Sequence, residues 1–126
     1  MGITMATAAR NAAADAVVDL LDVGTTNSSG QMVVRTSGDT ELCVLPLSNP
    51  AFGAASGGVA TAGAITTGTA TGAGTAAKHT MEDRNETEIW EGTAAAGSGD
   101  LNMSSTTIAV DDQISCSAYT YTQPAS

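Results

Sequence analysis

Residues 47–67, LSNPAFGAASGGVATAGAITT, decide how this chain can fold because they contain almost nothing larger than threonine. The same character continues in GTATGAGTAAKHT, residues 68–80. Within the first stretch, residues 57–67 alternate Val, Thr, Gly and Ile against alanine, which is the period of a β-strand. The side chains on both faces of such a strand are small. We therefore expect it to lie between two layers or close against another backbone.

The composition of the whole chain extends this picture. Ala, Gly, Ser and Thr supply roughly half of the 126 residues, and aromatic residues only 3%. Disordered chains combine low hydrophobicity with many charges or prolines, whereas 42% of this chain is hydrophobic and it has three prolines. We predict one domain, residues 1–126, with a thin core, because alanine buries little apolar area. A thin core favours stabilisation by neighbours, and thus oligomerisation or assembly on a lattice.

The net charge of −9 excludes two classes of partner. The basic residues are Arg10, Arg35, Lys78 and Arg84, which are scattered along the sequence. Nucleic-acid binding depends on clustered basic side chains that displace phosphate counterions, and an anionic membrane surface demands the same, so we expect neither partner. No apolar run approaches the length of a membrane span, and the N-terminus lacks the pattern of a secretory signal. We expect synthesis in a cytoplasm.

The N-terminal part has the periodicity of an amphipathic helix, which we place at residues 5–23. Gly24 is suited to end it. The leucine end of the apolar stripe is expected to anchor the helix, through Leu20 and Leu21. The stripe as a whole consists of Ala9, Ala12, Ala13, Ala16, Val17, Leu20 and Leu21.

Beyond the helix the period changes to two. Residues 31–36 and 40–48 read as strands joined by the SGD turn, and Pro46 places the second at a sheet edge or a bulge. Residues 75–93 read as a second hairpin, with Ala77, His79 and Met81 pointing inward and DRNE as its turn.

The C-terminal part adds three more short strands. DLNMS, residues 100–104, is one, and residues 107–122 supply the last two around a VDDQ turn. A bulge at 117–118 would turn four side chains into the core, namely Ile114, Cys116, Tyr119 and Tyr121. The fold class is mainly β: an antiparallel β-sandwich, jelly-roll-like or immunoglobulin-like, of about seven to eight short strands over residues 31–122, after one N-terminal α-helix.

The sequence offers little catalytic or metal-binding chemistry. The single histidine, His79, lies in a strand without ligand-spaced partners, so we predict no metal site, no cofactor and no catalytic residue. Cys43 and Cys116 are expected to be small buried hydrophobes rather than a disulfide. The acidic residues around the 83–86 turn, and the pair Asp111–Asp112, are interpreted as solvated side chains that confer solubility; calcium binding at the turn stays open. We predict a protein that is not an enzyme.

Four segments together resemble a family of small virion proteins of tailed bacteriophages. They are AVVDLLDVG (16–24), LPLSNPAFGAASGGVATAGAIT (45–66), TAAKHTMED (75–83) and GSGDLNMSSTTIAVDDQISCSAYTYTQPAS (97–126). The family pattern is similar to L-x-L-S-x-P-A-F-G-A-A-x-x-G-V-A-T-A-x-A-I, followed by D-L-N-L-x-x-T-x-I. The resemblance implies a structural component of the particle.

Three positions for such a component are compatible with the residues. An acidic, bulk-poor β-domain favours a capsid decoration (cement) protein that binds the major capsid protein and copies of itself, located in the virion. A neck or tail component is the first alternative. The second is a carbohydrate- or receptor-binding β-sandwich on the virion, for which an exposed aromatic is required. Trp90 is the residue that could provide this surface contact.

Overall fold

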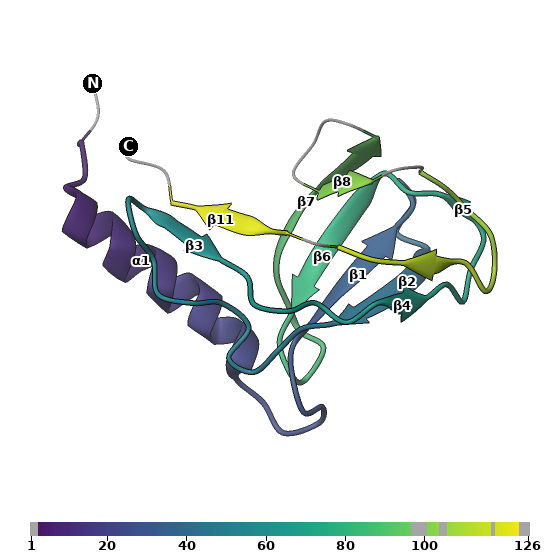
Figure 1. Ribbon diagram of the computed structural model, residues 1–126, viewed down its shortest axis with the longest axis horizontal. Helices are drawn as coiled ribbons and strands as arrows, with labels where there is room; N and C mark the ends of the chain where they lie inside the picture. The colour runs from purple at the N-terminus through teal and green to yellow at the C-terminus, as the bar shows by residue number, and fades with distance from the viewer. Residues whose placement is uncertain (1–2, 97–100, 104–105, 117, 124–126) are drawn as a thin grey trace.

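The computed structural model describes residues 3–96, 101–103, 106–116 and 118–123 (Figure 1). It confirms a mainly β fold that follows an N-terminal helix. The helical elements are α1 (Thr7–Asp19) and the 3-10 turn η1 (Leu20–Asp22). The strands are β1 (Gln31–Arg35), β2 (Glu41–Pro46), β3 (Val59–Thr61), β4 (Gly68–Thr69), β5 (Gly74–Thr75), β6 (Lys78–Glu82), β7 (Glu88–Ala96), β8 (Leu101–Met103), β9 (Thr107–Ile108), β10 (Gln113–Ile114) and β11 (Thr120–Thr122).

A central sheet with the strand order β2-β1-β6-β7-β8 organises the molecule. Its first four strands are antiparallel, and β8 pairs parallel with the end of β7. Both predicted hairpins are confirmed. In the first turn Asp39 takes a positive φ of 71°, and in the second the Asp83 carboxylate accepts the N–H groups of Asn85 and Thr87. Pro46 ends β2, the edge strand, as its missing N–H predicts.

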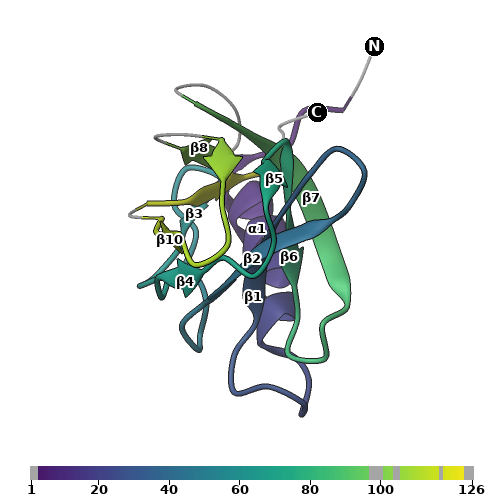
Figure 2. The ribbon, with the colours of Figure 1, turned by 90° about the vertical axis from the view of Figure 1, so that its right-hand side faces the viewer.

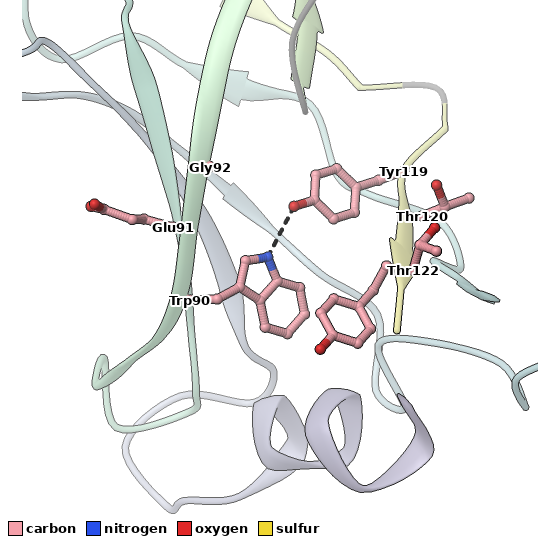
Figure 3. A pocket seen from close by; sticks show the side chains of 7 residues that line it. Trp90, Glu91, Gly92, Tyr119, Thr120 and Thr122 are labelled. Carbon is pink, nitrogen blue, oxygen red and sulfur yellow. Dashed lines mark hydrogen bonds between the residues drawn. The ribbon is translucent and has the colours of Figure 1, made fainter. Parts of the chain in front are cut away.

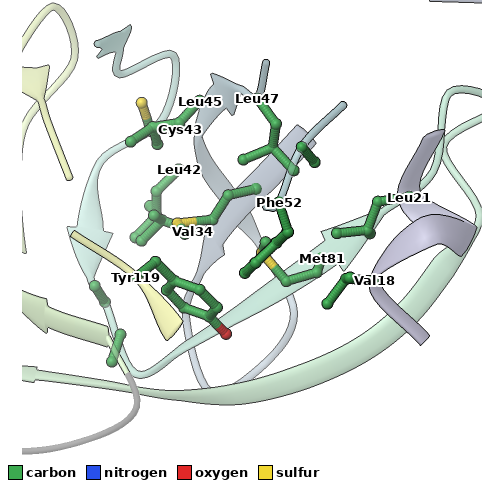
Figure 4. Close-up of a cluster of buried hydrophobic side chains, with 14 of the residues drawn as sticks. Val18, Leu21, Val34, Leu42, Cys43, Leu45, Leu47, Phe52, Met81 and Tyr119 are labelled. Carbon is green, nitrogen blue, oxygen red and sulfur yellow. The ribbon is translucent and has the colours of Figure 1, made fainter. Parts of the chain in front are cut away.

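The core lies on one face of this sheet (Figure 4). There Met32 and Met81 are directly opposite one another and fully buried. Helix α1 and η1 add Val18 and Leu21 to it, and Phe52 and Tyr119 come from segments outside the sheet. Three short ladders, β3–β11, β4–β10 and β5–β9, complete the structure, and they also contribute to this core (Figure 2). The helix and these ladders therefore share one hydrophobic core with the sheet.

The helix buries a different face from the predicted one. Leu21 is fully buried as expected, but Leu20 is 47% exposed, so the prediction that it anchors the helix is wrong. The buried residues are Ala14, Val18 and Leu21, a face turned by about one residue from the predicted stripe. The reason is that polar side chains on this face bind the backbone that lies against it.

Three helix side chains form that contact with residues 51–58. Asp22 accepts the Ala51 N–H at 2.9 Å, Asp15 accepts the Ala55 N–H at 2.7 Å, and Asn11 accepts the Gly58 N–H at 2.7 Å. These oxygens satisfy backbone N–H groups that have no partner in a β-ladder. An interpretation of the helix periodicity that considers only hydrophobic burial overlooks such contacts. The helix is therefore attached by hydrogen bonds as much as by apolar packing.

Small residues further along the chain, at positions 66–72, also allow two backbones to approach closely. The chain from Thr66 to Gly72 runs along the outer edge of β2, where the Thr66 and Thr71 N–H groups donate to Pro46 and Leu42 carbonyls. A Cβ at Gly68 would lie 2.2 Å from the Val44 oxygen. The predicted strand at 57–67 is much shorter than expected, because only Val59–Thr61 pairs as β3. Outside it, Gly58 donates to the helix, Gly63 to Ala51 and Thr66 to β2.

The predicted last strand is divided into β10 and β11. Tyr119 is buried, while Ile114, Cys116 and Tyr121 are half-buried and pack against the core, as predicted for all four side chains. The bulge predicted at 117–118 involves Ser117, which lies outside the described residues.

Candidate functional site: an aromatic cleft between two strand edges

A cleft of about 490 Å³ opens between β7 and β11 (Figure 3). Trp90, Glu91 and Gly92 line it from β7, and residues 119–122 line it from β11. Its volume is within the range of small-ligand sites in proteins. The Trp90 and Tyr119 rings project between the two strands, whereas the Glu91 side chain points away from the cleft. Tyr121 also lines the cleft.

The rings of this cleft belong to one cluster that contains every aromatic residue of the chain. Phe52 packs edge-on against Trp90 and against Tyr119, with centroids 6.1 Å apart in both pairs. Trp90 and Tyr121 have centroids 5.0 Å apart and planes tilted by 39°. Such contacts add to the stabilisation from burial and hold each ring in a fixed orientation. The cleft thus has a preformed aromatic wall.

A chain of hydrogen bonds holds the rings of this aromatic wall in place. Trp90 Nε1 donates to the Tyr119 hydroxyl at 3.0 Å, and that hydroxyl lies 2.7 Å from His79 Nε2. His79 Nδ1 lies 3.2 Å from the Thr93 carbonyl, which can only accept, so Nδ1 carries the proton and Nε2 accepts from Tyr119. His79 is fully buried with both nitrogens engaged, so its role in this arrangement is to orient Tyr119.

The two strands that flank the cleft turn backbone groups toward it. On β11, Tyr119 O and Gln123 N–H bond to the β3 side, so alternation directs the N–H and C=O groups of Thr120 and Thr122 to the cleft. On β7, Ala94 N–H and the Thr87 carbonyl bond to the β6 side, which directs the backbone of Glu91 to the cleft. Among the described residues, none hydrogen-bonds Thr120, Thr122 or Glu91 from this side.

The structure places the other candidate residues away from this cleft. Leu21 is in the core and Leu20 is on the outer side of the helix. Cys43 is fully buried and Cys116 half-buried; both thiols are free, and burial raises the pKa of each. Trp90, predicted as a possible contact residue, is half-buried in the cleft wall.

The acidic residues near the second turn have structural roles that the sequence did not reveal. Glu82 is 5% exposed and pairs with Arg35 at 3.0 Å, while its other oxygen accepts from Gln31 at 2.8 Å. Asp83 closes the turn. The interpretation of these two residues as solvated is therefore wrong, because both carboxylates are buried and accept hydrogen bonds from the protein. Among the described residues no group of three or more His, Cys, Asp or Glu side chains could hold a metal ion.

Comparison with known proteins yields no relative: no family model, no curated protein and no solved structure matches this chain. Within the described part of the chain, no helix has the length and apolar character needed to cross a membrane.

Chemically, the cleft is suited to binding. It presents ring faces together with the backbone donors and acceptors of Thr120 and Thr122, whose side chains point away from the rings (Figure 3). The sequence identified Trp90 but did not indicate the part that Tyr121 and the two threonines play. The signal for them was the TYT alternation in the last strand, which puts hydroxyls and aromatics on opposite faces.

Proposed function

We propose that this chain is a non-enzymatic structural protein of a tailed-bacteriophage particle, a capsid decoration protein that binds repeatedly to the major capsid lattice. The resemblance to small virion proteins, most specific around residues 45–65 and 100–124, is the starting point. The physical support comes from the surface of the helix.

The outer side of the helix carries the observation on which this proposal depends. Four of the seven residues in the stripe that its sequence predicts to be buried are exposed: Ala9, Ala12, Ala16 and Leu20, the last to 47%. Val23, just after η1, is 55% exposed beside them. The opposite side is held to residues 51–58 by hydrogen bonds. An exposed apolar strip on a small acidic domain marks a surface for another protein to cover.

The remaining properties agree with a lattice-bound subunit. The charge of −9 keeps the free protein soluble, and the same weak contact repeated over many capsid sites gives a stably covered shell.

The experiment is co-sedimentation of the purified protein with undecorated capsids. The double variant Leu20→Glu/Val23→Glu should reduce occupancy strongly, because two carboxylates would be desolvated in the contact. Ser37→Glu, an exposed residue in the first hairpin turn, is the matched control and should bind like the parent chain. Full occupancy by the double variant would contradict the proposal.

Copy number separates the shell from the neck or tail. Quantitative mass spectrometry of purified particles should find hundreds of copies for a capsid protein, against about a dozen or fewer at the symmetry-limited neck. A result of about a dozen copies or fewer would instead support a position at the neck or in the tail.

A further inference from the structure

We propose that the cleft between β7 and β11 binds the N-terminal arm, residues 3–6, of a second copy of this chain, which adds a strand to the open edge of β11. The expected product is a dimer in which arms are exchanged. This inference does not depend on the capsid role, since it concerns contacts between two copies of the free protein.

The receiving edge has the chemistry of a strand-addition site. Thr120 and Thr122 direct N–H and C=O groups into the cleft, and among the described residues none pairs with them there. An extended polypeptide satisfies such groups at regular spacing, whereas a small ligand meets only some of them. The rings of Trp90 and Tyr121 lie directly beside this edge, so an added strand also finds an apolar surface.

The donor segment has the chemistry of an added strand. Ile3 is 85% exposed, the highest value among the exposed large hydrophobic residues of the described chain. Ala6, which precedes the helix, has extended dihedrals of φ −65° and ψ 155°. Ile3 and Met5 are two residues apart, so in a strand they lie on one face, with Thr4 on the other. Met5 is suited to this cleft because thioethers make favourable contacts with aromatic rings.

Both parts lie at the same end of the molecule, which makes reciprocal exchange feasible. The start of α1 and the end of β11 approach each other there (Figure 1). Arg10 of α1 donates to the Gln123 carbonyl, just beyond β11, through Nε at 3.2 Å and through a second guanidinium nitrogen at 3.0 Å. The arm therefore starts about one helical turn from the β11 edge. Two copies related by a twofold axis can each place an arm on the other's edge.

Sedimentation equilibrium of the full chain over a wide concentration range tests the proposal first. The parent chain should show a concentration-dependent dimer. Ile3→Asp removes the apolar side chain of the donor, and Thr122→Pro removes an N–H that faces the cleft while it leaves the β3 pairing intact. Each variant should weaken dimerisation at least about tenfold. Ser37→Asp, in a distant turn, should leave it unchanged. Circular dichroism and thermal unfolding confirm that each variant is folded.

A mixing experiment tests whether the arm acts between chains. The Ile3→Asp chain has an intact edge, and the Thr122→Pro chain has an intact arm. Their mixture should form a heterodimer, detected by native mass spectrometry, although each alone is impaired. No heterodimer would overturn an exchange in which arm and edge come from different copies.

Trp90, the only tryptophan, reports on the cleft directly. A synthetic peptide with the sequence of residues 1–8 should change its fluorescence saturably in the Ile3→Asp protein. A peptide in which aspartate replaces the isoleucine should not.

Three results would overturn the proposal. The first is a parent chain that stays monomeric throughout. The second is a dimer insensitive to both single variants, which would assign self-association to another surface, such as the exposed helix stripe. The third is a Trp90 response to soluble oligosaccharides without one to the peptide, which would make the cleft a carbohydrate site. The first two results would not determine the outcome of the capsid co-sedimentation experiment, which tests the capsid role separately.

Discussion

The two halves of the structure, the central sheet and the helix on residues 51–58, are held together by different interactions. On the central sheet, the contact is between apolar side chains: Met32, Met81 and Leu45 pack against one another and are almost completely buried. Between the helix and residues 51–58, the contact consists largely of carboxylate and amide oxygens that accept backbone N–H groups. A chain poor in bulky side chains can therefore still fix its tertiary structure, provided that small residues bring backbones within hydrogen-bonding reach.

The largest expected effect is in the packed half. Met81→Ala removes a fully buried side chain opposite both Met32 and Trp90 and leaves a cavity. We expect a loss of about 3 kcal/mol in the free energy of unfolding, measured by urea denaturation. Val110→Ala, at a position that is 54% exposed, is the control. A loss below about 1 kcal/mol would mean that the sheet core is not tightly packed.

A slightly smaller effect is expected where backbones meet. Gly68→Ala would place its Cβ 2.2 Å from the Val44 oxygen and 2.7 Å from the Cys43 sulfur. Because the first of these atoms belongs to the backbone, the two segments must move apart, at a cost of about 2 kcal/mol. Gly38→Ala, whose nearest neighbour would be 3.9 Å away, is the matched control and should change stability little. Equal denaturation midpoints for the two variants would refute the close approach.

The hydrogen-bonded half is tested by a pair of substitutions at Asp15. Asp15→Ala leaves the Ala55 N–H without its acceptor and should reduce the free energy of unfolding by about 1 kcal/mol. Asp15→Asn retains the oxygen and should recover most of that loss. Asp19→Ala, on the exposed side, serves as the control for the change in helix propensity. If Asn proved no better than Ala, the contact would depend on charge rather than on the hydrogen bond.

The same contrast explains what could be predicted from the sequence. The sheet hairpins were predictable because period-two alternation and turn residues are local signals, as at residues 31–48. The helix face was not: an alanine-rich helix has little difference in hydrophobicity between its sides, so the hydrogen bonds of Asn11 and Asp15 decided its orientation. Those bonds join residues about 40 apart or more and leave no periodic trace.

The candidate site was predictable only in part, for a similar reason. Trp90 attracts notice as the single tryptophan, but its setting depends on Phe52, Tyr119 and Tyr121, which reach it from distant parts of the chain. The open edge of β11 follows from which strand pairs with it, and sequence alternation does not specify strand partners.

A modest chemical difference should separate the two cysteines. Burial raises the pKa of both thiols, so at pH 8 each has less thiolate than a free cysteine and both should alkylate slowly. Cys43 is fully buried under the 66–72 segment, whereas Cys116 is half-buried, so Cys116 should react first in iodoacetamide labelling followed by mass spectrometry. Gly68→Ala should accelerate labelling of Cys43. Labelling of Cys43 ahead of Cys116 in the parent chain would show that the segment opens readily.

The smallest effect concerns the surface pair Asp39–Lys78, which supports the first hairpin turn. The hydrogen bond with Lys78, followed by its charge, lowers the pKa of Asp39 from the ordinary value of 3.8, and the hydrogen bond to Asp39 raises that of Lys78 from 10.5. A lowered folded-state pKa of Asp39 stabilises the fold above pH 3.8, and this contribution is lost as the pH falls through the folded value.

Asp39→Asn isolates the charge, because asparagine tolerates the positive φ of 71° at this position. Its destabilisation at pH 7 should be small, since the pair is exposed to solvent, and should disappear both in about 1 M salt and at a pH well below 3.8. Thermal unfolding of the two proteins at pH 7 and pH 2.5 measures this difference. A difference that persisted at low pH would mean that the carboxylate acts through turn geometry, not through its charge.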